Sequence, residues 1–118
     1  MSYDISLVDP VTYETLEVEN AHFIRGGTYA LGGTTECWLN ITYNYGPFFR
    51  KVLGPDGIRS IYGLSGAESI PMLKKAISEL ADDVSDNYWD ATEGNAKKAL
   101  YGLLALAQMR PDRIWEGD

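Results

Sequence analysis

Hydrophobic and polar residues alternate along the start of the chain. Tyr3, Ile5 and Leu7 are separated by Asp4 and Ser6, and Leu16 and Val18 alternate with Thr15, Glu17 and Glu19. A two-residue period is typical of a strand with one buried face. Because Asp9-Pro10 between the two runs is a turn signal, the pattern predicts a β-hairpin.

The longest alternation covers residues 37–45. One face carries Cys37, Leu39, Ile41, Tyr43 and Tyr45, and the other carries Trp38, Asn40, Thr42 and Asn44. β-Branched and aromatic residues favour strands, so we expect a strand whose Cys37 face is buried. On that face Cys37 is expected to act as a small buried hydrophobe.

Glycine and proline interrupt the chain after this run. Gly46-Pro47 can open a short helix and Gly54-Pro55 can end it, so residues 48–53 are predicted to be helical. Ile58–Tyr62 is expected to form a further short strand. Residues 1–62 are therefore predicted to be mainly strands.

The second half has the spacing of amphipathic helices. The apolar residues Ile70, Leu73, Ala76, Ile77 and Leu80 recur every three or four positions, and a second stripe runs from Ala96 to Ala107. Ser65 with Glu68, and Asp90 with Glu93, have the spacing of capping boxes. The pattern predicts helices over 66–82 and 91–109, with Asp90 as the cap of the second.

A short tail follows Arg110-Pro111. Its Trp115 is expected to dock residues 110–118 onto the body of the protein. Strands that precede helices favour the α+β class over a parallel α/β fold. We therefore expect one domain, residues 1–118, with an N-terminal antiparallel sheet packed against two C-terminal helices.

The chain has 118 residues and a formal net charge of −7. A protein that binds nucleic acid must neutralise phosphate charges with clustered Lys and Arg, so direct DNA or RNA binding is not expected. A basic protein partner is expected instead. No apolar stretch is long enough to span a membrane, and the first ten residues lack the pattern of a secretory signal. With one cysteine and hence no internal disulfide, the composition indicates a cytoplasmic protein.

No catalytic or metal-binding constellation is evident. His22 is the single histidine, and no motif pairs it with a nucleophile. A calcium loop that starts at Asp82 would place Val84 at its third position and Asn87 at its sixth, where an oxygen ligand and a glycine are needed. We therefore assign no catalytic residue, metal or cofactor.

Six acidic residues and no Lys or Arg lie between Ala76 and Ala96. One interpretation is a solvated connection between two helices, with carboxylates at the helix ends. The other is a partner-binding surface with aromatic anchors, since aromatic residues dominate interface hot spots. The residues assigned to that surface are Asp82, Asp83, Asp86, Tyr88, Trp89 and Asp90.

Glycines and aromatic residues offer an alternative site. Glycines flank Thr28–Leu31, and Gly63–Gly66 lies between a predicted strand and a helix, where N–H groups can hold an anion. An ordinary strand-to-helix turn capped by Ser65 explains Gly63–Gly66 better, since such turns are common whatever the function. The residues of this nucleotide or sugar-phosphate site are Tyr29, Trp38, Asn40, Gly63, Ser65 and Gly66.

The chain contains the three runs GGTYALGGTTECWLNITYNYG, GIRSIYG and EGNAKKALYGLLALAQMRPDRIW. They resemble small uncharacterised proteins of bacteria and phage-like mobile elements. The resemblance implies a small stand-alone intracellular protein and names no catalytic residue. Together these features favour a non-enzymatic protein-interaction module, such as a mobile-element inhibitor or regulator of a host protein. The alternative is a small-molecule-binding module.

Overall fold

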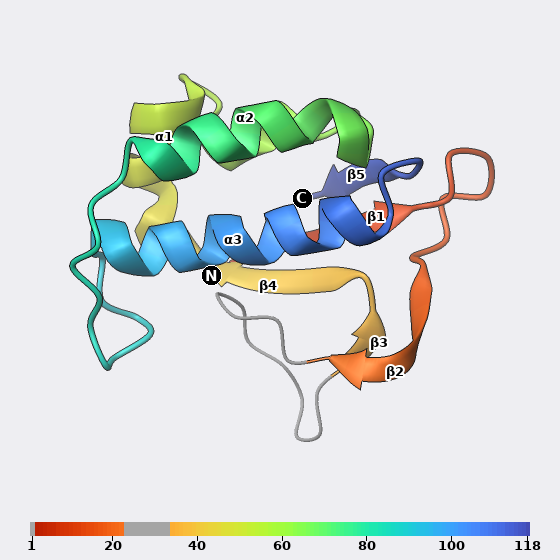
Figure 1. Cartoon of the computed structure of the whole chain (residues 1–118), viewed down its shortest axis with the longest axis horizontal. Coiled ribbons are helices and arrows are strands. Elements are labelled where there is room, and N and C mark those ends of the chain that lie inside the picture. Colours follow the sequence, from red (N-terminus) through yellow and green to blue (C-terminus); the bar gives the residue numbers. More distant parts are fainter. Residues whose placement is uncertain (1, 23–33) are drawn as a thin grey trace.

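The computed structural model describes residues 2–22 and 34–118, and Figure 1 shows their arrangement. The elements follow in the order β1 (Ser2–Val8), β2 (Glu17–His22), β3 (Thr34–Glu36), β4 (Trp38–Thr42), a 3₁₀-helix (Tyr43–Tyr45), α1 (Gly46–Leu53), a second 3₁₀-helix (Gly57–Ile61), α2 (Gly66–Ser78), α3 (Glu93–Met109) and β5 (Ile114–Gly117). The expected α+β class is confirmed.

A three-stranded antiparallel sheet has the order β4-β1-β5. In the register of β1 with β4, Tyr3 lies opposite Ile41 and Ile5 lies opposite Leu39. These four side chains are buried, whereas Asp4 between them is exposed. The two-residue period of the sequence therefore places one face of the sheet in the core.

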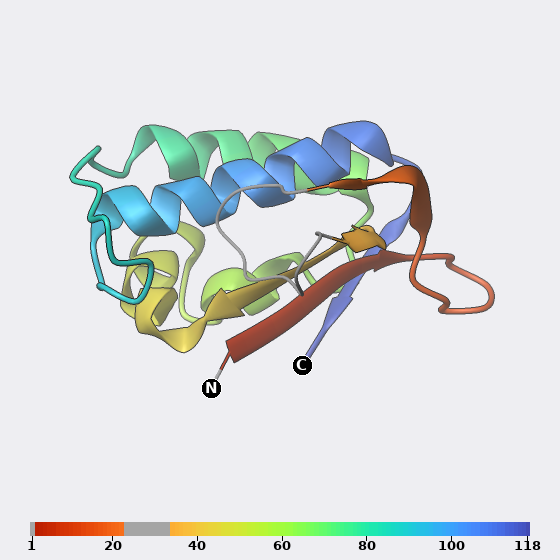
Figure 2. The ribbon, with the colours of Figure 1, turned by 90° about the horizontal axis from the view of Figure 1, so that it is seen from below.

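Helices α2 and α3 lie side by side as a layer over that face (Figure 2). The expected capping box begins α2, because Ser65 Oγ accepts the Glu68 N–H and the Glu68 carboxylate accepts the Ser65 N–H. The carboxylate's pKa is lowered by the Ser65 backbone and side-chain hydrogen bonds. The core fills the space between the layers with Leu73, Ile77, Leu100 and Leu103 among others.

The C-terminal tail docks as expected, through β5. Leu7 of β1 lies opposite Trp115, whose indole is 1% exposed. In the core, Trp115 Nε1 donates to Ser69 Oγ of α2 at 2.7 Å. The last strand of the chain therefore connects the sheet to the helical layer.

Several local predictions were wrong in detail. The chain turns back after β1, with Leu16 N–H donating to the Leu7 carbonyl, but β2 then pairs with β3 and not with β1. Ile58–Tyr62 is no strand, because Gly57–Ile61 forms a 3₁₀-helix whose first residue, Gly57, has φ +58°.

The predicted long strand over 37–45 is also shorter than expected. It ends at Thr42, whose Oγ1 accepts the Asn44 N–H and caps a 3₁₀-helix. Helix α2 ends at Ser78, before the predicted boundary at residue 82. Among residues 2–22 and 34–118, no helix has the length and apolar character needed to cross a bilayer.

Candidate functional site: the connection between α2 and α3

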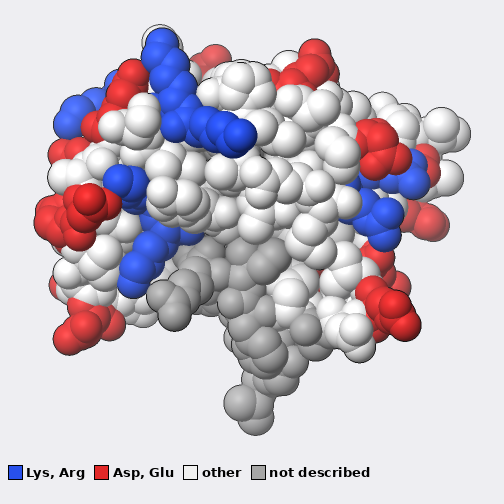
Figure 3. Space-filling view, in the orientation of Figure 1, with Lys and Arg blue, Asp and Glu red and all other residues white. Residues whose placement is uncertain are grey.

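The acidic connection, residues 81–92, joins the end of α2 to the start of α3 at one end of the molecule (Figure 1). Acidic side chains stand out at the same edge in the space-filling view, with Lys and Arg beside them (Figure 3). The segment contains neither helix nor strand. Its conformation is therefore set by hydrogen bonds of side chains with the backbone.

Asn95, in the first turn of α3, holds the acidic connection from the inside. Its side chain is nearly fully buried at 4% exposure. Asn95 Oδ1 accepts the Ser85 N–H at 3.1 Å, and Nδ2 donates to the carbonyls of Asn87 and Asp90, each at 3.1 Å. A single amide thus satisfies three backbone groups of the loop.

Tyr88 binds the acidic connection to the end of β4. Its hydroxyl accepts the Thr42 N–H at 3.1 Å and donates to the Asn40 carbonyl at 3.2 Å. The hydroxyl of Tyr45 donates in turn to the Tyr88 carbonyl. Burial raises the pKa of the Tyr88 phenol, against the opposing effect of the Thr42 hydrogen bond. Tyr88 is half-buried and structural, so it does not stand in solvent as an anchor.

The carboxylates of the acidic connection differ in role. Asp90 accepts from Ser85 Oγ at 2.5 Å and from Asn87 Nδ2 at 3.2 Å, which organises the turn itself. Asp83 accepts the Gly94 N–H at 3.2 Å. Asp82 pairs with Lys97 at 2.7 Å, and this hydrogen bond raises the pKa of the Lys97 ammonium. Asp86 is exposed.

The predicted cap of α3 was wrong. Thr92, and not Asp90, is the cap, and its Oγ1 accepts the Asn95 N–H at 3.0 Å. Glu93 instead reaches back across the loop, accepting the Ala81 N–H and pairing with Lys51 of α1, each at 3.1 Å. Both contacts lower the pKa of the Glu93 carboxyl, the Ala81 N–H most.

Trp89 stands out from this hydrogen-bonded framework. Its side chain is 52% exposed, and its ring packs edge-on against Tyr88 with the ring centroids 4.9 Å apart. Asn44 Nδ2 donates to the Trp89 carbonyl at 2.8 Å and fixes the backbone there. Nearby in sequence, Val84 is 48% exposed. We call Val84, Asp86 and Trp89, with Asp82, Asp83 and Asp90, the Trp89 surface.

Of the alternative ligand site, the described residues Trp38 and Asn40 are not brought together with the Gly63–Gly66 turn. Tyr29 and the rest of Thr28–Leu31 lie outside the described residues. Trp38 Nε1 donates to Asp4 Oδ1 at 3.2 Å, and Asn40 Nδ2 donates to the same oxygen at 2.8 Å. These polar groups bond within the sheet, between β4 and β1.

The Gly63–Gly66 turn lies beyond the opposite edge of that sheet. Gly63 N–H donates to the Trp115 carbonyl of β5 at 2.9 Å. Three spacings of about 4.8 Å separate the turn from β4, because β5 and β1 lie between them. The turn is therefore roughly 14 Å from β4. At the start of α2, Gly66 N–H donates to the Arg113 carbonyl and Ala67 N–H to the Pro111 carbonyl, so an anion would have to displace these bonds.

The remaining candidate groups are engaged or buried. His22 Nε2 donates to the Glu36 carbonyl, across the β2–β3 pair. Cys37 is fully buried, and burial raises the pKa of its thiol. Within 2–22 and 34–118, no group of three or more His, Cys, Asp or Glu residues has the geometry to hold a metal ion.

Sequence reasoning identified Trp89 but missed the residues that position it. Asn44 and Tyr45 lie in the first 3₁₀-helix and Asn95 lies in α3, and nothing in their local sequence relates them to the loop. Gly94 carried a weak signal as a glycine in the first turn of a helix, and a Cβ there would lie 2.7 Å from the backbone of Asp83 and Val84.

The chain was compared with protein-family models, with curated proteins and with solved structures, and none of the three comparisons found a match.

Proposed function

We propose that this chain is a non-enzymatic protein-interaction module that binds a basic surface of its partner through the Trp89 surface. The observation that carries the proposal is the exposure of Trp89, at 52%, on a loop whose backbone is fixed by Asn95, Tyr88 and Asn44. A large apolar ring is left half in water although the loop around it is ordered. Tryptophan is among the residues most enriched in interface hot spots.

Preorganisation supports this role. Ordering a flexible loop on binding costs free energy, and a loop already held in place avoids most of that cost. The Trp89 backbone is fixed through its carbonyl, and its ring rests on Tyr88. Partner binding therefore requires little rearrangement of this side.

Charge defines the partner. Between Ala76 and Ala96 the chain has six carboxylates and no Lys or Arg, and the whole chain carries −7. Two of the six, Asp82 and Glu93, pair with Lys97 and Lys51, and the other four leave the segment acidic. Complementary charge increases association rates and discriminates against acidic proteins. The partner that fits is a protein with a Lys- and Arg-rich rim around an apolar pocket for an indole. We propose that the module acts in a bacterial host as an inhibitor or regulator, which is what the resemblance to mobile-element proteins implies.

A matched pair of variants tests the proposal. Proteins captured from bacterial lysate by the wild-type chain are compared with those captured by Trp89→Ala and by Tyr101→Ala. Tyr101, on α3, is equally exposed at 53% but lies outside the Trp89 surface. We expect a stoichiometric partner whose affinity falls about 30-fold or more with Trp89→Ala, the effect of losing a hot spot of about 2 kcal/mol.

Tyr101→Ala should retain the partner, and binding should weaken as salt screens the carboxylates. Equal loss with both variants would exclude the Trp89 surface as the contact. Absence of any stoichiometric partner in lysates of several hosts would contradict the function itself.

A further inference from the structure

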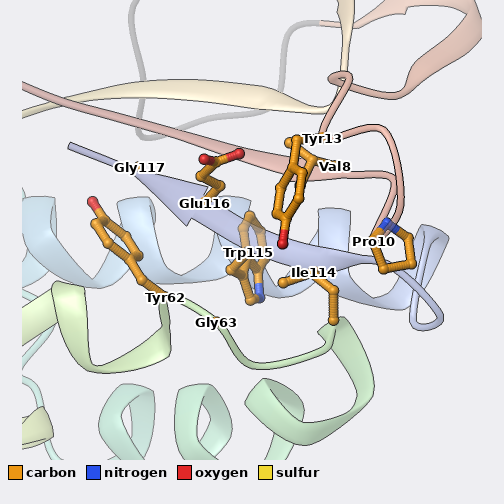
Figure 4. A pocket seen from close by; sticks show the side chains of 9 residues that line it. All are labelled: Val8, Pro10, Tyr13, Tyr62, Gly63, Ile114, Trp115, Glu116 and Gly117. Carbon is orange, nitrogen blue, oxygen red and sulfur yellow. The ribbon is translucent and has the colours of Figure 1, made fainter.

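A cavity of about 420 Å³ lies beside β5, between the turn that follows β1 and the segment that leads into α2 (Figure 4). Only one of its residues, Gly63, belongs to a site expected from the sequence. The lining residues are Val8, Pro10, Tyr13, Tyr62, Gly63, Ile114, Trp115, Glu116 and Gly117.

Two glycines leave part of the cavity lining without side chains. Gly63 has φ +87°, a conformation that favours glycine. A Cβ on Gly117 would lie 2.5 Å from Tyr62 Cζ and 2.8 Å from the Asp4 carbonyl. Gly117 therefore allows the Tyr62 ring to pack directly on the backbone of β5. Figure 4 shows the Trp115 side chain and the Glu116 side chain on opposite sides of that strand.

Tyr13 lines the cavity from the other side. It has φ +60°, which is uncommon for a residue with a side chain, and its side chain is 64% exposed. Its turn is firmly held, because Tyr13 N–H donates to the Asp9 carbonyl and Asp9 Oδ1 accepts the N–H groups of Val11 and Thr12. Asp9 Oδ2 also pairs with Arg113 at 3.3 Å. The turn thus holds the Tyr13 backbone beside the cavity in spite of an unfavourable backbone angle.

The charge of the cavity is negative. Glu116 is the one charged residue among those that line it. The cationic residue nearest to Glu116 in the sequence is Arg113. It pairs with Asp9, and its Nε lies 3.6 Å from Asp112 Oδ2. A carboxylate and an exposed tyrosine ring, Glu116 and Tyr13, that line the same cavity attract a cation. A guanidinium suits them best because it stacks on aromatic faces and binds carboxylates through two N–H groups.

We propose that this cavity binds an alkylguanidinium group, with Glu116 accepting its N–H groups and Tyr13 contacting its planar face. The site is separate from the Trp89 surface and does not depend on the proposed function. The group can come from a free alkylguanidine or from an arginine side chain of a peptide. The two sources share this chemistry and are distinguished by the probes.

Three probes are titrated into the ¹⁵N-labelled chain and followed by amide chemical shifts: agmatine, N-acetyl-arginine-N-methylamide and the neutral N-acetyl-citrulline-N-methylamide. We expect saturable shifts at Gly63, Glu116 and Gly117 with a dissociation constant of about 1–10 mM, a modest affinity for so small a ligand. Citrulline should bind at least about tenfold more weakly because it lacks the charge. Tighter binding of the arginine amide than of agmatine identifies a peptide as the source, and the reverse identifies a free alkylguanidine.

Variants test the assignment within the same spectra, which also report whether each variant is folded. Glu116→Gln keeps the shape of the side chain and should weaken binding about tenfold, as should Tyr13→Ala. The control Glu79→Gln removes an exposed carboxylate from the end of α2, and it should leave binding unchanged. Equal shifts with citrulline, no saturable shifts, or unchanged binding by Glu116→Gln would overturn the proposal. Trp89→Ala should leave this binding intact, so failure here and failure of the proposed function are distinguishable.

Discussion

The backbone N–H of Thr42 donates to the Tyr88 hydroxyl at 3.1 Å, across 46 residues of chain. The same hydroxyl donates to the Asn40 carbonyl at 3.2 Å. One side chain from the acidic connection therefore bonds two backbone groups at the end of β4. Since β4 is an edge strand of the three-stranded sheet, Tyr88 couples the stability of that edge to the order of the Trp89 surface.

Tyr88→Phe should accordingly destabilise the protein although the ring is retained. The variant leaves the Thr42 N–H and the Asn40 carbonyl without this partner. We expect the free energy of unfolding, measured by urea denaturation, to fall by about 1–3 kcal/mol.

The control for this substitution is Tyr101→Phe, which removes the same hydroxyl from an exposed ring on α3. Its effect should stay within about 0.5 kcal/mol, as is usual on the surface. If the two variants were equally stable, the hydrogen bonds of Tyr88 would contribute nothing to the fold.

Features encoded by neighbouring residues were predictable. The alternation of Tyr3, Ile5 and Leu7 indicates the buried face of β1 by itself, and the Ser65–Glu68 spacing indicates the start of α2. Trp115 was expected to dock because an apolar ring of that size is costly to leave in water. Each of these predictions needs only the local chain and the hydrophobic effect.

Features that depend on distant partners were not predictable. β1 pairs with β4 and β5, and nothing in its sequence prefers those strands to β2. Asp90 has the spacing of a helix cap, but its carboxylate is engaged by Ser85 and Asn87, so Thr92 takes that position. The candidate site shows the same dependence on distant partners. Trp89 could be picked out by its residue type, whereas the hydrogen bonds by which Asn95 holds its loop could not be foreseen.

Asn95→Asp should loosen the acidic connection. The aspartate keeps an oxygen for the Ser85 N–H but loses both donors, and it places a carboxylate against the carbonyls of Asn87 and Asp90. We expect faster amide hydrogen exchange in residues 85–92 and a loss of stability of about 1–3 kcal/mol. Exchange measured residue by residue by NMR would show both effects.

Gln108→Glu serves as the control for Asn95→Asp, because it makes the same charge change on an exposed position of the same helix. It should leave exchange in the loop unchanged. Protection of residues 85–92 in Asn95→Asp at the wild-type level would show that the other contacts suffice to order the loop.

Stability should fall in alkaline solution because of buried phenols. Tyr45 is 1% exposed, and burial, followed by the charges of Tyr88 and Asp90, raises its pKa. Above about pH 10 the unfolded chain releases the phenolic proton while the folded chain keeps it. The unfolded state then binds fewer protons, so the free energy of unfolding decreases by up to about 1.4 kcal/mol per pH unit for this group.

Urea denaturation between about pH 9 and pH 11 measures that slope, since the phenol of an unfolded tyrosine titrates near pH 10. Tyr45→Phe should be less stable at neutral pH, having lost its hydrogen bond to the Tyr88 carbonyl, but its stability should decline less steeply with pH. An unchanged slope in Tyr45→Phe would mean that Tyr45 ionises in the folded chain as readily as in the unfolded one.

The contact between β5 and α2 offers a matched pair of serines. Ser69 Oγ donates to the Gly66 carbonyl at 2.7 Å, and Ser78 Oγ donates to the Lys75 carbonyl at 2.6 Å, so both bond three residues back in the same helix. Of the two serines, only Ser69 is buried, and its Oγ also accepts a hydrogen bond from Trp115 Nε1. Ser69→Ala therefore leaves a buried indole N–H without its acceptor and should cost about 1–3 kcal/mol. Ser78→Ala, on the exposed end of α2, should change stability by less than about 0.5 kcal/mol.

A double-mutant cycle separates this hydrogen bond from the packing of the indole. Trp115→Phe removes the donor and part of the ring, and the phenyl group needs no acceptor. In that background Ser69→Ala should cost less than in the wild type, by a coupling free energy of about 1 kcal/mol from urea denaturation. Additive effects would show that Ser69 and Trp115 stabilise the fold independently, and the hydrogen bond between the tail and α2 would then carry no free energy of its own.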